Sequence, residues 1–176
     1  MLLKDKLSLV TGAARGLGEA IARRMAAEGA HVLVVDRDLE PAQRVAASIR
    51  AAGGRADADS VDVSDAAAVD ALAARIAAAH GDIDVLVNNA GISARSKFDE
   101  PGAREAWDRV LSVNLQGVFN VTQAFVPALK RTHGSIVNLS SIVAFGAGIS
   151  SAGYVVAKGG VRSLTQVLAR DLAPWG

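Results

Sequence analysis

The sequence predicts an α/β fold in which helices cover both faces of a doubly wound parallel sheet, a three-layer αβα arrangement. Short runs of β-branched residues alternate with longer alanine-rich stretches, which is the pattern of repeated strand–helix–strand units. The centres of the runs are apolar without alternation, as in Val32-Leu33-Val34-Val35, which is typical of strands covered on both faces. A glycine-rich turn joins the first run to the first helical stretch.

Each predicted strand is short and is followed by a helical stretch. Four strands cover residues 7–11, 31–36, 84–88 and 135–140, and a weaker run covers residues 58–63. We expect them to lie parallel in one sheet, because right-handed crossovers through the intervening helices join such strands.

Three shorter helices are predicted by apolar residues three or four positions apart. Their stripes are Leu17, Ile21 and Met25; Val45, Ile49 and Ala52; and Val69, Leu72 and Ile76. Ser64 is the expected N-cap of the third helix, because its hydroxyl can accept a hydrogen bond from a first-turn amide.

Two longer helices are predicted in the second half of the chain. The first spans residues 105–131, and Pro127 is expected to kink it or to mark its last turns. The second spans residues 152–172 and is expected to stop before Pro174.

Composition excludes several classes of protein. The chain has 176 residues, of which 51% are hydrophobic and 21% charged, so it can bury the core of one domain and is not intrinsically disordered. A net charge of +1 without a basic cluster argues against a nucleic-acid partner. The absence of cysteine excludes disulfides and thiolate metal sites. No apolar run approaches the ~20 residues of a membrane span, so we expect no membrane contact and a cytoplasmic location.

A phosphate-binding loop is predicted between the first strand and the first helix. Its sequence is Thr11-Gly12-Ala13-Ala14-Arg15-Gly16-Leu17-Gly18. Helix N-terminal amides and the helix dipole attract phosphate there. We expect Gly12 to permit the tight turn, Gly16 to let a pyrophosphate approach the backbone, and Gly18 to let the helix pack on the strand. Arg15 and Leu17 are candidate contacts to the same dinucleotide, although a tight turn without a ligand is the alternative.

Asp36, at the end of the second strand, is the candidate ligand of an adenosine ribose. A carboxylate near this position accepts hydrogen bonds from ribose hydroxyls and repels a 2′-phosphate, which favours NAD. Arg15 and Arg37 could instead bind that phosphate, so NADP is possible. Asp62 and Val63, at the third strand end, are candidate contacts to adenine, and a solvated turn or capping acid is the alternative for Asp62.

Tyr154 and Lys158 are the candidate proton-transfer pair. They lie four residues apart in a predicted helix, so both side chains should lie on one face. A phenol titrates near pH 10 in water, and a nearby cation favours the phenolate, which makes tyrosine a workable general acid/base. A half-buried tyrosine beside an unrelated lysine is the alternative.

Three further groups could belong to the same site. Ser140-Ser141 lies at the carboxyl end of the strand at 135–140, where a hydroxyl could donate to a developing alkoxide; a serine pair that caps the strand end is the alternative. Asn114 interrupts an apolar helical stripe, so its buried amide must bond to a water or to a backbone carbonyl, or is simply a satisfied core residue. The segment Asn88-Asn89-Ala90-Gly91 is a turn by its spacing alone, and it could instead line the cofactor groove. The small, apolar segment 142–153, with Val143, Phe145 and Ile149, is expected to line the substrate pocket, and residues 91–102 are expected to add to its mouth. The three histidines are scattered without ligand spacing, and we expect no metal site.

Together these motifs resemble the short-chain dehydrogenase/reductase family over the whole chain. The resemblance implies a single Rossmann-like catalytic domain over residues 1–176 that interconverts a secondary alcohol and a ketone with NAD(P)(H). It implies that Tyr154 exchanges a proton with the substrate oxygen and that Lys158 binds the nicotinamide ribose. It also implies that Ser141 steadies the substrate oxygen, that Asn114 holds a water, and that the protein is a homo-oligomer.

The chain departs from the family pattern after its last predicted helix. Family members continue into a further strand, a substrate-covering loop and a final strand, whereas this sequence stops at Gly176. We therefore expect the last strands to be missing and the strand at 135–140 to form an apolar edge. Val161, Leu164, Val167 and Leu168 should lose part of their cover. The alternative function is a nucleotide-binding module that binds NAD without efficient turnover.

Overall fold

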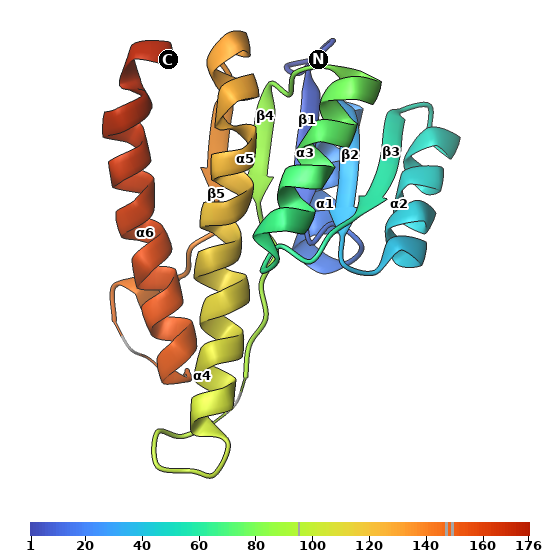
Figure 1. Ribbon diagram of the computed structural model, residues 1–176. Coiled ribbons are helices and arrows are strands. Elements are labelled where there is room, and N and C mark those ends of the chain that lie inside the picture. The colour runs from blue at the N-terminus through green and yellow to red at the C-terminus, as the bar shows by residue number, and fades with distance from the viewer. Residues whose placement is uncertain (95, 147, 149) are drawn as a thin grey trace.

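A computed structural model describes residues 1–94, 96–146, 148 and 150–176 (Figure 1). Its centre is a parallel sheet of five strands in the order β3-β2-β1-β4-β5. The strands are β1 (Leu7–Thr11), β2 (His31–Asp36), β3 (Arg55–Ser60), β4 (Val85–Asn88) and β5 (Ser135–Asn138). The predicted α/β doubly wound fold is confirmed, since every strand pair is parallel and a helix precedes each later strand.

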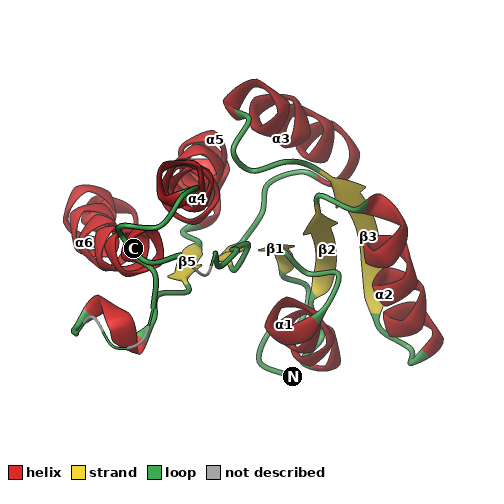
Figure 2. Cartoon of the chain, turned by 90° about the horizontal axis from the view of Figure 1, so that it is seen from below, coloured by secondary structure: helices red, strands yellow, loops and turns green. Residues whose placement is uncertain are grey.

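Helices cover both faces of the sheet, as the view along the strands shows (Figure 2). One face carries α1 (Gly16–Ala27) and α2 (Leu39–Ala51). The other carries α3 (Ala66–His80) and α5 (Gly117–Thr132), with α6 (Ala152–Leu172) beside α5. Alternate residues of β2 therefore enter opposite cores: Val32 packs with α1 and α2, whereas Leu33 packs with α3 and α5. No helix in the described ranges is long and apolar enough to cross a bilayer.

The predicted helix at 105–131 is one continuous rod with an irregular centre. It consists of α4 (Ala103–Leu111), the π-helical segment η1 (Ser112–Gln116) and α5. Pro127 lies in the last turns of α5, as predicted, where the missing amide removes one helical hydrogen bond. The predicted helix at 152–172 has the bounds of α6, and the short turn η3 (Ala173–Trp175) contains Pro174.

The predicted position of the third strand and the predicted cap of the third helix are wrong. The third strand is Arg55–Ser60 rather than residues 58–63, because it is a polar edge strand whose apolar neighbours Val61 and Val63 are buried in the loop beyond it. Asp65, not Ser64, caps α3 by accepting a hydrogen bond from the Ala68 amide.

Leu17 and Ala52 also differ from the predicted helical stripes. Leu17 is 72% exposed, since it lies in the first turn of α1, beyond the edge of the sheet; Ala22 and Met25 bury the helix instead. Ala52 is exposed because it follows the end of α2.

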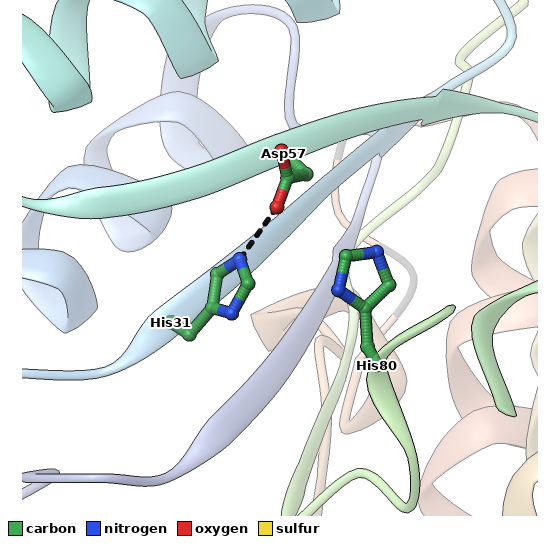
Figure 3. Close-up of side chains that lie close together, drawn as sticks. All are labelled: His31, Asp57 and His80. Carbon is green, nitrogen blue, oxygen red and sulfur yellow. Dashed lines mark hydrogen bonds and ion pairs between the residues drawn. The ribbon is translucent and has the colours of Figure 1, made fainter. Parts of the chain in front are cut away.

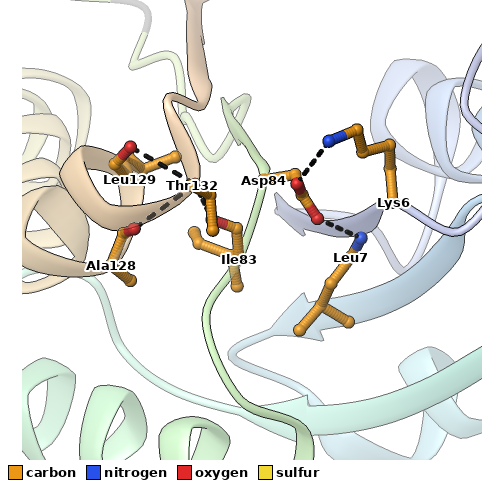
Figure 4. A network of polar contacts seen from close by, with 7 residues as sticks. All are labelled: Lys6, Leu7, Ile83, Asp84, Ala128, Leu129 and Thr132. Carbon is orange, nitrogen blue, oxygen red and sulfur yellow. Dashed lines mark hydrogen bonds and ion pairs between the residues drawn. The ribbon is translucent and has the colours of Figure 1, made fainter. Parts of the chain in front are cut away.

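Polar contacts tie together the end of the molecule at which the strands begin (Figure 4). Asp84 accepts hydrogen bonds from Lys6 Nζ at 2.7 Å and from the Leu7 amide at 2.8 Å. Thr132 Oγ1, at the end of α5, donates to carbonyl oxygens, with Ile83 O at 2.9 Å. The start of β1, the start of β4 and the end of α5 are thereby held in register.

Two of the histidines that the sequence left separate meet at this same end. His31 begins β2 and His80 ends α3, and their ring centroids lie 5.3 Å apart. The expectation of scattered histidines is wrong for this pair. β2 begins and α3 ends at the same end of the sheet, and this brings the two rings together.

Candidate active site

A cleft of about 450 Å³ opens where the strands end. Ligands of doubly wound sheets bind at this edge, outside the carboxyl ends of the strands. The predicted site residues that line the cleft are Gly12, Arg15, Leu17, Gly18, Asp36, Arg37, Asp62, Val63, Asn89, Ala90, Gly91, Tyr154 and Lys158. Gly16, Asn114 and Ser141 do not line it, whereas Thr11, Ile92, Leu139 and Ser140 do.

The glycine loop is too closely packed to accept side chains at two positions. Gly12 has a φ of +62°, and a Cβ there would lie 2.7 Å from the Ala90 Cα. A Cβ on Gly18 would overlap the carbonyl oxygen of Gly12. The N-cap residue of α1, Arg15, makes no side-chain hydrogen bond to the first turn, so among the described residues its side chain leaves the first-turn amides available to an anion. The loop therefore has the shape and polarity that a pyrophosphate requires.

Side chains from the neighbouring strands hold this loop in place. Asn89 Nδ2 donates to the carbonyl oxygens of Thr11 and Gly12, both at 2.9 Å. Thr11 Oγ1 accepts from the amides of Asn89 and Ala90, each at 3.1 Å. Thr11 was not predicted as a positioning residue, because its partners lie about 78 residues away and no local pattern indicates them.

Two carboxylates, Asp36 at the end of β2 and Asp62 after β3, line the cleft. Asp36 Oδ2 accepts a hydrogen bond from the Ala14 amide at 3.0 Å, so this carboxylate also braces the glycine loop. Asp62 Oδ1 accepts from the hydroxyl of Ser64 at 2.6 Å and from its amide at 2.9 Å. These bonds, with a weaker contribution from the positive charge of Arg37, lower the pKa of Asp62. Asp62 therefore stabilises a turn, which was the alternative interpretation, and also lines the cleft.

Tyr154 and Lys158 share one face of α6, as predicted, and both line the cleft. The Lys158 ammonium nitrogen lies 5.8 Å from the centre of the Tyr154 ring. Lys158 is only 5% exposed, and this burial lowers its pKa. Its ammonium donates to the Leu139 carbonyl at 2.6 Å, which fixes the charge at the end of β5. A cation and a phenol therefore line the same cleft as the glycine loop.

Asn114 is fully buried within η1 and makes a reciprocal pair of hydrogen bonds. Its Oδ1 accepts from the Ile92 amide and its Nδ2 donates to the Ile92 carbonyl, both at 2.8 Å. The partner is thus a backbone carbonyl, one of the two that the sequence left open. π-helical turns are frequent at functional sites, and this one ties the helix to a residue that lines the cleft.

Comparison with known proteins gives the family of this chain. Residues 6–176 match the family described as short chain dehydrogenase. The chain belongs to this family. It is 42% identical over 174 residues to the short-chain reductase protein NovJ of Streptomyces niveus, covering 98% of this chain and 66% of that protein. It is 38% identical to the 3-oxoacyl-[acyl-carrier-protein] reductase FabG of Thermotoga maritima, covering 98% of this chain and 70% of FabG.

Solved structures agree with this assignment. The gluconate 5-dehydrogenase of Burkholderia cenocepacia, crystallised with NADP and tartrate, superposes with a TM-score of 0.92 at 38% identity. The match covers 99% of this chain and 68% of that one. This short-chain dehydrogenase family chain therefore spans about two thirds of the length of the relatives it matches.

Ser141, the serine of the family pattern, lies outside the lining of the cleft. Ser141 Oγ accepts from the Val143 amide at 3.3 Å and caps the short helix η2 (Ile142–Ala144). Its neighbour Ser140 lines the cleft, and its hydroxyl donates to the Lys158 carbonyl at 2.8 Å. The family resemblance implied Ser141, whereas the residue that lines the described cleft is Ser140.

The expected substrate pocket between residues 142 and 153 is open. Ile142 is 89% exposed and Phe145 is 78% exposed, so neither is enclosed as a pocket wall would be. Ile149, which was also expected to line the pocket, lies outside the described residues. The segment from Gly91 to Ser93 does line the cleft, as expected.

Proposed function

We propose that this chain binds a nicotinamide dinucleotide and interconverts a secondary alcohol and a ketone. The observation that carries the proposal is the shared cleft: the glycine loop after β1 and the Tyr154–Lys158 pair of α6 open into the same 450 Å³ space. A volume of this size is in the usual range for small-molecule and cofactor sites.

The residues of the cleft suit a dinucleotide. The amides at the start of α1, with Gly12 and Gly18 leaving room for close approach, would hold the pyrophosphate. Asp36 would accept the ribose hydroxyls of adenosine, and Asn89 would keep the loop in its binding shape. Lys158 would reach the nicotinamide ribose. When bound, the dinucleotide supplies or accepts the hydride.

Proton transfer is assigned to the chain's own side chains. The Tyr154 hydroxyl gives its proton to the substrate oxygen during reduction and takes it back during oxidation. The Lys158 ammonium, held by the Leu139 carbonyl, places a positive charge in the same cleft, where negative charge develops on oxygen during this exchange. Ser141 has its hydroxyl hydrogen available to steady the substrate oxygen, since the contact with Val143 uses an oxygen lone pair. Asn114, anchored on Ile92, would support a water in the proton path.

NAD is the proposed cofactor, with NADP as the competing one. The Asp36 carboxylate repels a 2′-phosphate and already accepts an amide hydrogen bond that fixes its position. Arg37 pairs loosely with Asp38 at 3.7 Å and could turn toward a phosphate instead. The NADP-bound relative supports keeping both cofactors in the test.

The proposed substrate is a small alcohol or ketone, and the proposed assembly is a homo-oligomer. The similar proteins carry names with different substrates, so the substrate class is left at a secondary alcohol or ketone. Apolar residues exposed on α5 and α6, among them Phe119, Val156 and Val167, support an interface between copies of the chain.

Replacing Tyr154 by phenylalanine tests the proposal by removing one oxygen atom. We expect turnover of a panel of secondary alcohols to fall about 10²- to 10⁴-fold. NADH affinity, measured by fluorescence titration and compared with NADPH, should stay within a few-fold. Ser163→Ala is the control, because Ser163 is exposed on the same helix and does not line the cleft.

The open surroundings of Tyr154 support a second candidate function, a module that binds NAD without efficient turnover. Ile142 and Phe145 do not enclose the site, and water exclusion is part of efficient hydride and proton transfer. NADH binding by the unmodified chain without measurable turnover would favour a nucleotide-binding module. Turnover that is equal in Tyr154→Phe and in the unmodified chain would refute the proposed proton-transfer role.

A further inference from the structure

Three potential metal ligands converge at the end of the molecule opposite the cleft. They are His31 at the start of β2, Asp57 in β3 and His80 at the end of α3 (Figure 3). One ligand atom from each lies within 4.8 Å of the other two. The sequence separates these residues by 26 and 23 positions, so only the fold brings them together.

Strand register explains why the three side chains meet. His31 pairs with Arg55 and Leu33 pairs with Asp57, so His31 and Asp57 are diagonal neighbours on one face of the sheet. Leu33 shows that this face is the one packed on α3. The last residue of α3 then carries the His80 ring to the same place.

Among the described residues, the hydrogen bonds of this cluster leave several potential metal-ligand atoms without a partner. His31 Nε2 lies 2.7 Å from Asp57 Oδ2, and this contact accounts for one ring nitrogen and one carboxylate oxygen. Among the described residues, the His80 ring makes no hydrogen bond and stands edge-on to the His31 ring. A cation placed between the three groups would engage the second imidazole as well.

The local electrostatics suit a cation. Asp57 contributes a negative charge, and the carbonyl end of the 15-residue helix α3 adds partial negative charge beside His80. Arg55 is the nearby opposing charge, and its guanidinium is directed to the Asp5 carboxylate at 3.6 Å and the Gly29 carbonyl at 3.4 Å. Arg55 is thus engaged elsewhere, and Arg75 on the same face pairs with Asp59 at 3.0 Å.

We propose that His31, Asp57 and His80 bind a divalent transition-metal ion of the zinc class, with water completing the coordination. Two imidazole nitrogens and one carboxylate oxygen are borderline ligands that suit Zn²⁺, whereas Mg²⁺ and Ca²⁺ prefer sites built from oxygen alone. The site is separate from the cleft and does not depend on the proposed oxidoreductase activity.

Binding requires only side-chain movement. Ligand atoms of a tetrahedral zinc ion lie about 3.3 Å apart, given metal–ligand bonds near 2.0–2.2 Å. His80 would therefore move inward and the short His31–Asp57 contact would lengthen. His80 and Asp57 are exposed and can make this change without repacking the core. The ion would join β2, β3 and α3, and would stabilise the folded chain by mass action.

Zinc titration of the full chain tests this site. At pH 7.5, calorimetry with Zn²⁺ should give one ion per chain, and Mg²⁺ at the same concentration should give no binding. His80→Ala and Asp57→Asn should each weaken zinc binding about tenfold or more, since each removes one ligand. Zinc should raise the Tm of the unmodified chain more than that of His80→Ala at the same zinc concentration.

Matched controls separate this site from general surface binding. Asp59→Asn alters the next carboxylate on the same strand face, which is occupied by Arg75 at 3.0 Å. His133→Asn removes the imidazole outside the cluster and keeps a residue tolerant of the positive φ at this position. Both should bind zinc like the unmodified chain. Equal zinc affinity in His80→Ala, or an equal loss in Asp59→Asn, would overturn the proposal.

Discussion

The strands β1 and β5 have similar sequences and opposite surroundings. β1 reads Leu-Ser-Leu-Val-Thr and is buried along its whole length between β2 and β4. β5 reads Ser-Ile-Val-Asn, pairs with β4, and alternates between exposed and half-buried residues at the edge of the described sheet. An apolar strand sequence therefore indicates a place in the sheet, whereas its neighbours determine how much of it is buried.

The candidate active site contains residues from both regions, the buried surroundings of β1 and the exposed surroundings of β5. The glycine loop follows β1 and is clamped by Asn89, whereas Lys158 and Tyr154 belong to α6 and are tied to the chain that follows β5. The residues proposed to bind the dinucleotide thus belong to the well-buried part of the molecule. Those proposed to move protons belong to a part that exposes apolar side chains, among them Val137 and Val167.

Truncating one apolar side chain in each strand gives the largest expected contrast. Leu9 in β1 is fully buried, so Leu9→Ala should lower the free energy of unfolding by about 3 kcal/mol through lost burial and a cavity. Val137 in β5 is 48% exposed, so Val137→Ala should change it by about 0.5 kcal/mol or less. Urea unfolding of both variants measures the difference. Equal losses would show that β5 is covered in solution.

Alanine in place of a helical glycine should act in opposite directions in the two regions. Gly18→Ala places a methyl group against the Gly12 carbonyl, so we expect a loss of about 2 kcal/mol and weaker NADH binding. Gly159→Ala in α6 meets no atom within 4 Å and should gain about 0.5–1 kcal/mol from helix propensity. Thermal unfolding and NADH titration measure both effects. A stabilising Gly18→Ala would contradict the close packing of the glycine loop.

The smallest expected effect is a pH dependence at Lys158. Burial lowers its pKa, so between the folded value and the unfolded value near 10.4 the unfolded chain binds more protons. The cost of burying the ammonium is therefore complete below the folded pKa and disappears as pH rises toward 10.4. Lys158→Met should be most favourable, relative to the unmodified chain, at pH 7, and this advantage should shrink by pH 10.

Unfolding in urea at pH 7 and pH 10 measures this change, which we expect to be about 1 kcal/mol or less. Lys97→Met is the control, since the Lys97 side chain is exposed near Glu100 and its removal should give no such trend. An advantage of Lys158→Met that grows with pH would contradict the assignment.

Sequence patterns predicted the central strands and failed at the polar edge. β1 and β2 have the predicted bounds, because their continuous apolar runs are buried on both faces. β3 has only Ala56 and Ala58 as inward apolar residues, so the stronger apolar signal of Val61 and Val63 displaced the predicted strand by three residues. The polar alternation of Arg55 to Asp59 was the signal that could have located it.

The candidate site was predictable where a motif lies at a strand end. The glycine loop, Asp36 and the Tyr154–Lys158 spacing all lie at the cleft, because parallel strands bring their carboxyl ends to one edge. The brace from Thr11 to Asn89 and the meeting of His31 with His80 depend on register between distant segments. Local spacing contains no information about such register.

The two hydrogen bonds between α6 and the segment after β5 have a mechanical consequence. Lys158 Nζ donates to the Leu139 carbonyl, and Ser140 Oγ donates to the Lys158 carbonyl, so this lysine is fastened at both its tip and its backbone. A strand that pairs with the free edge of β5 would restrict the motion of Leu139 and Ser140, and thereby of the Lys158 ammonium, without touching the cleft. The position of the Lys158 charge in the cleft therefore depends on how firmly the edge strand β5 is held.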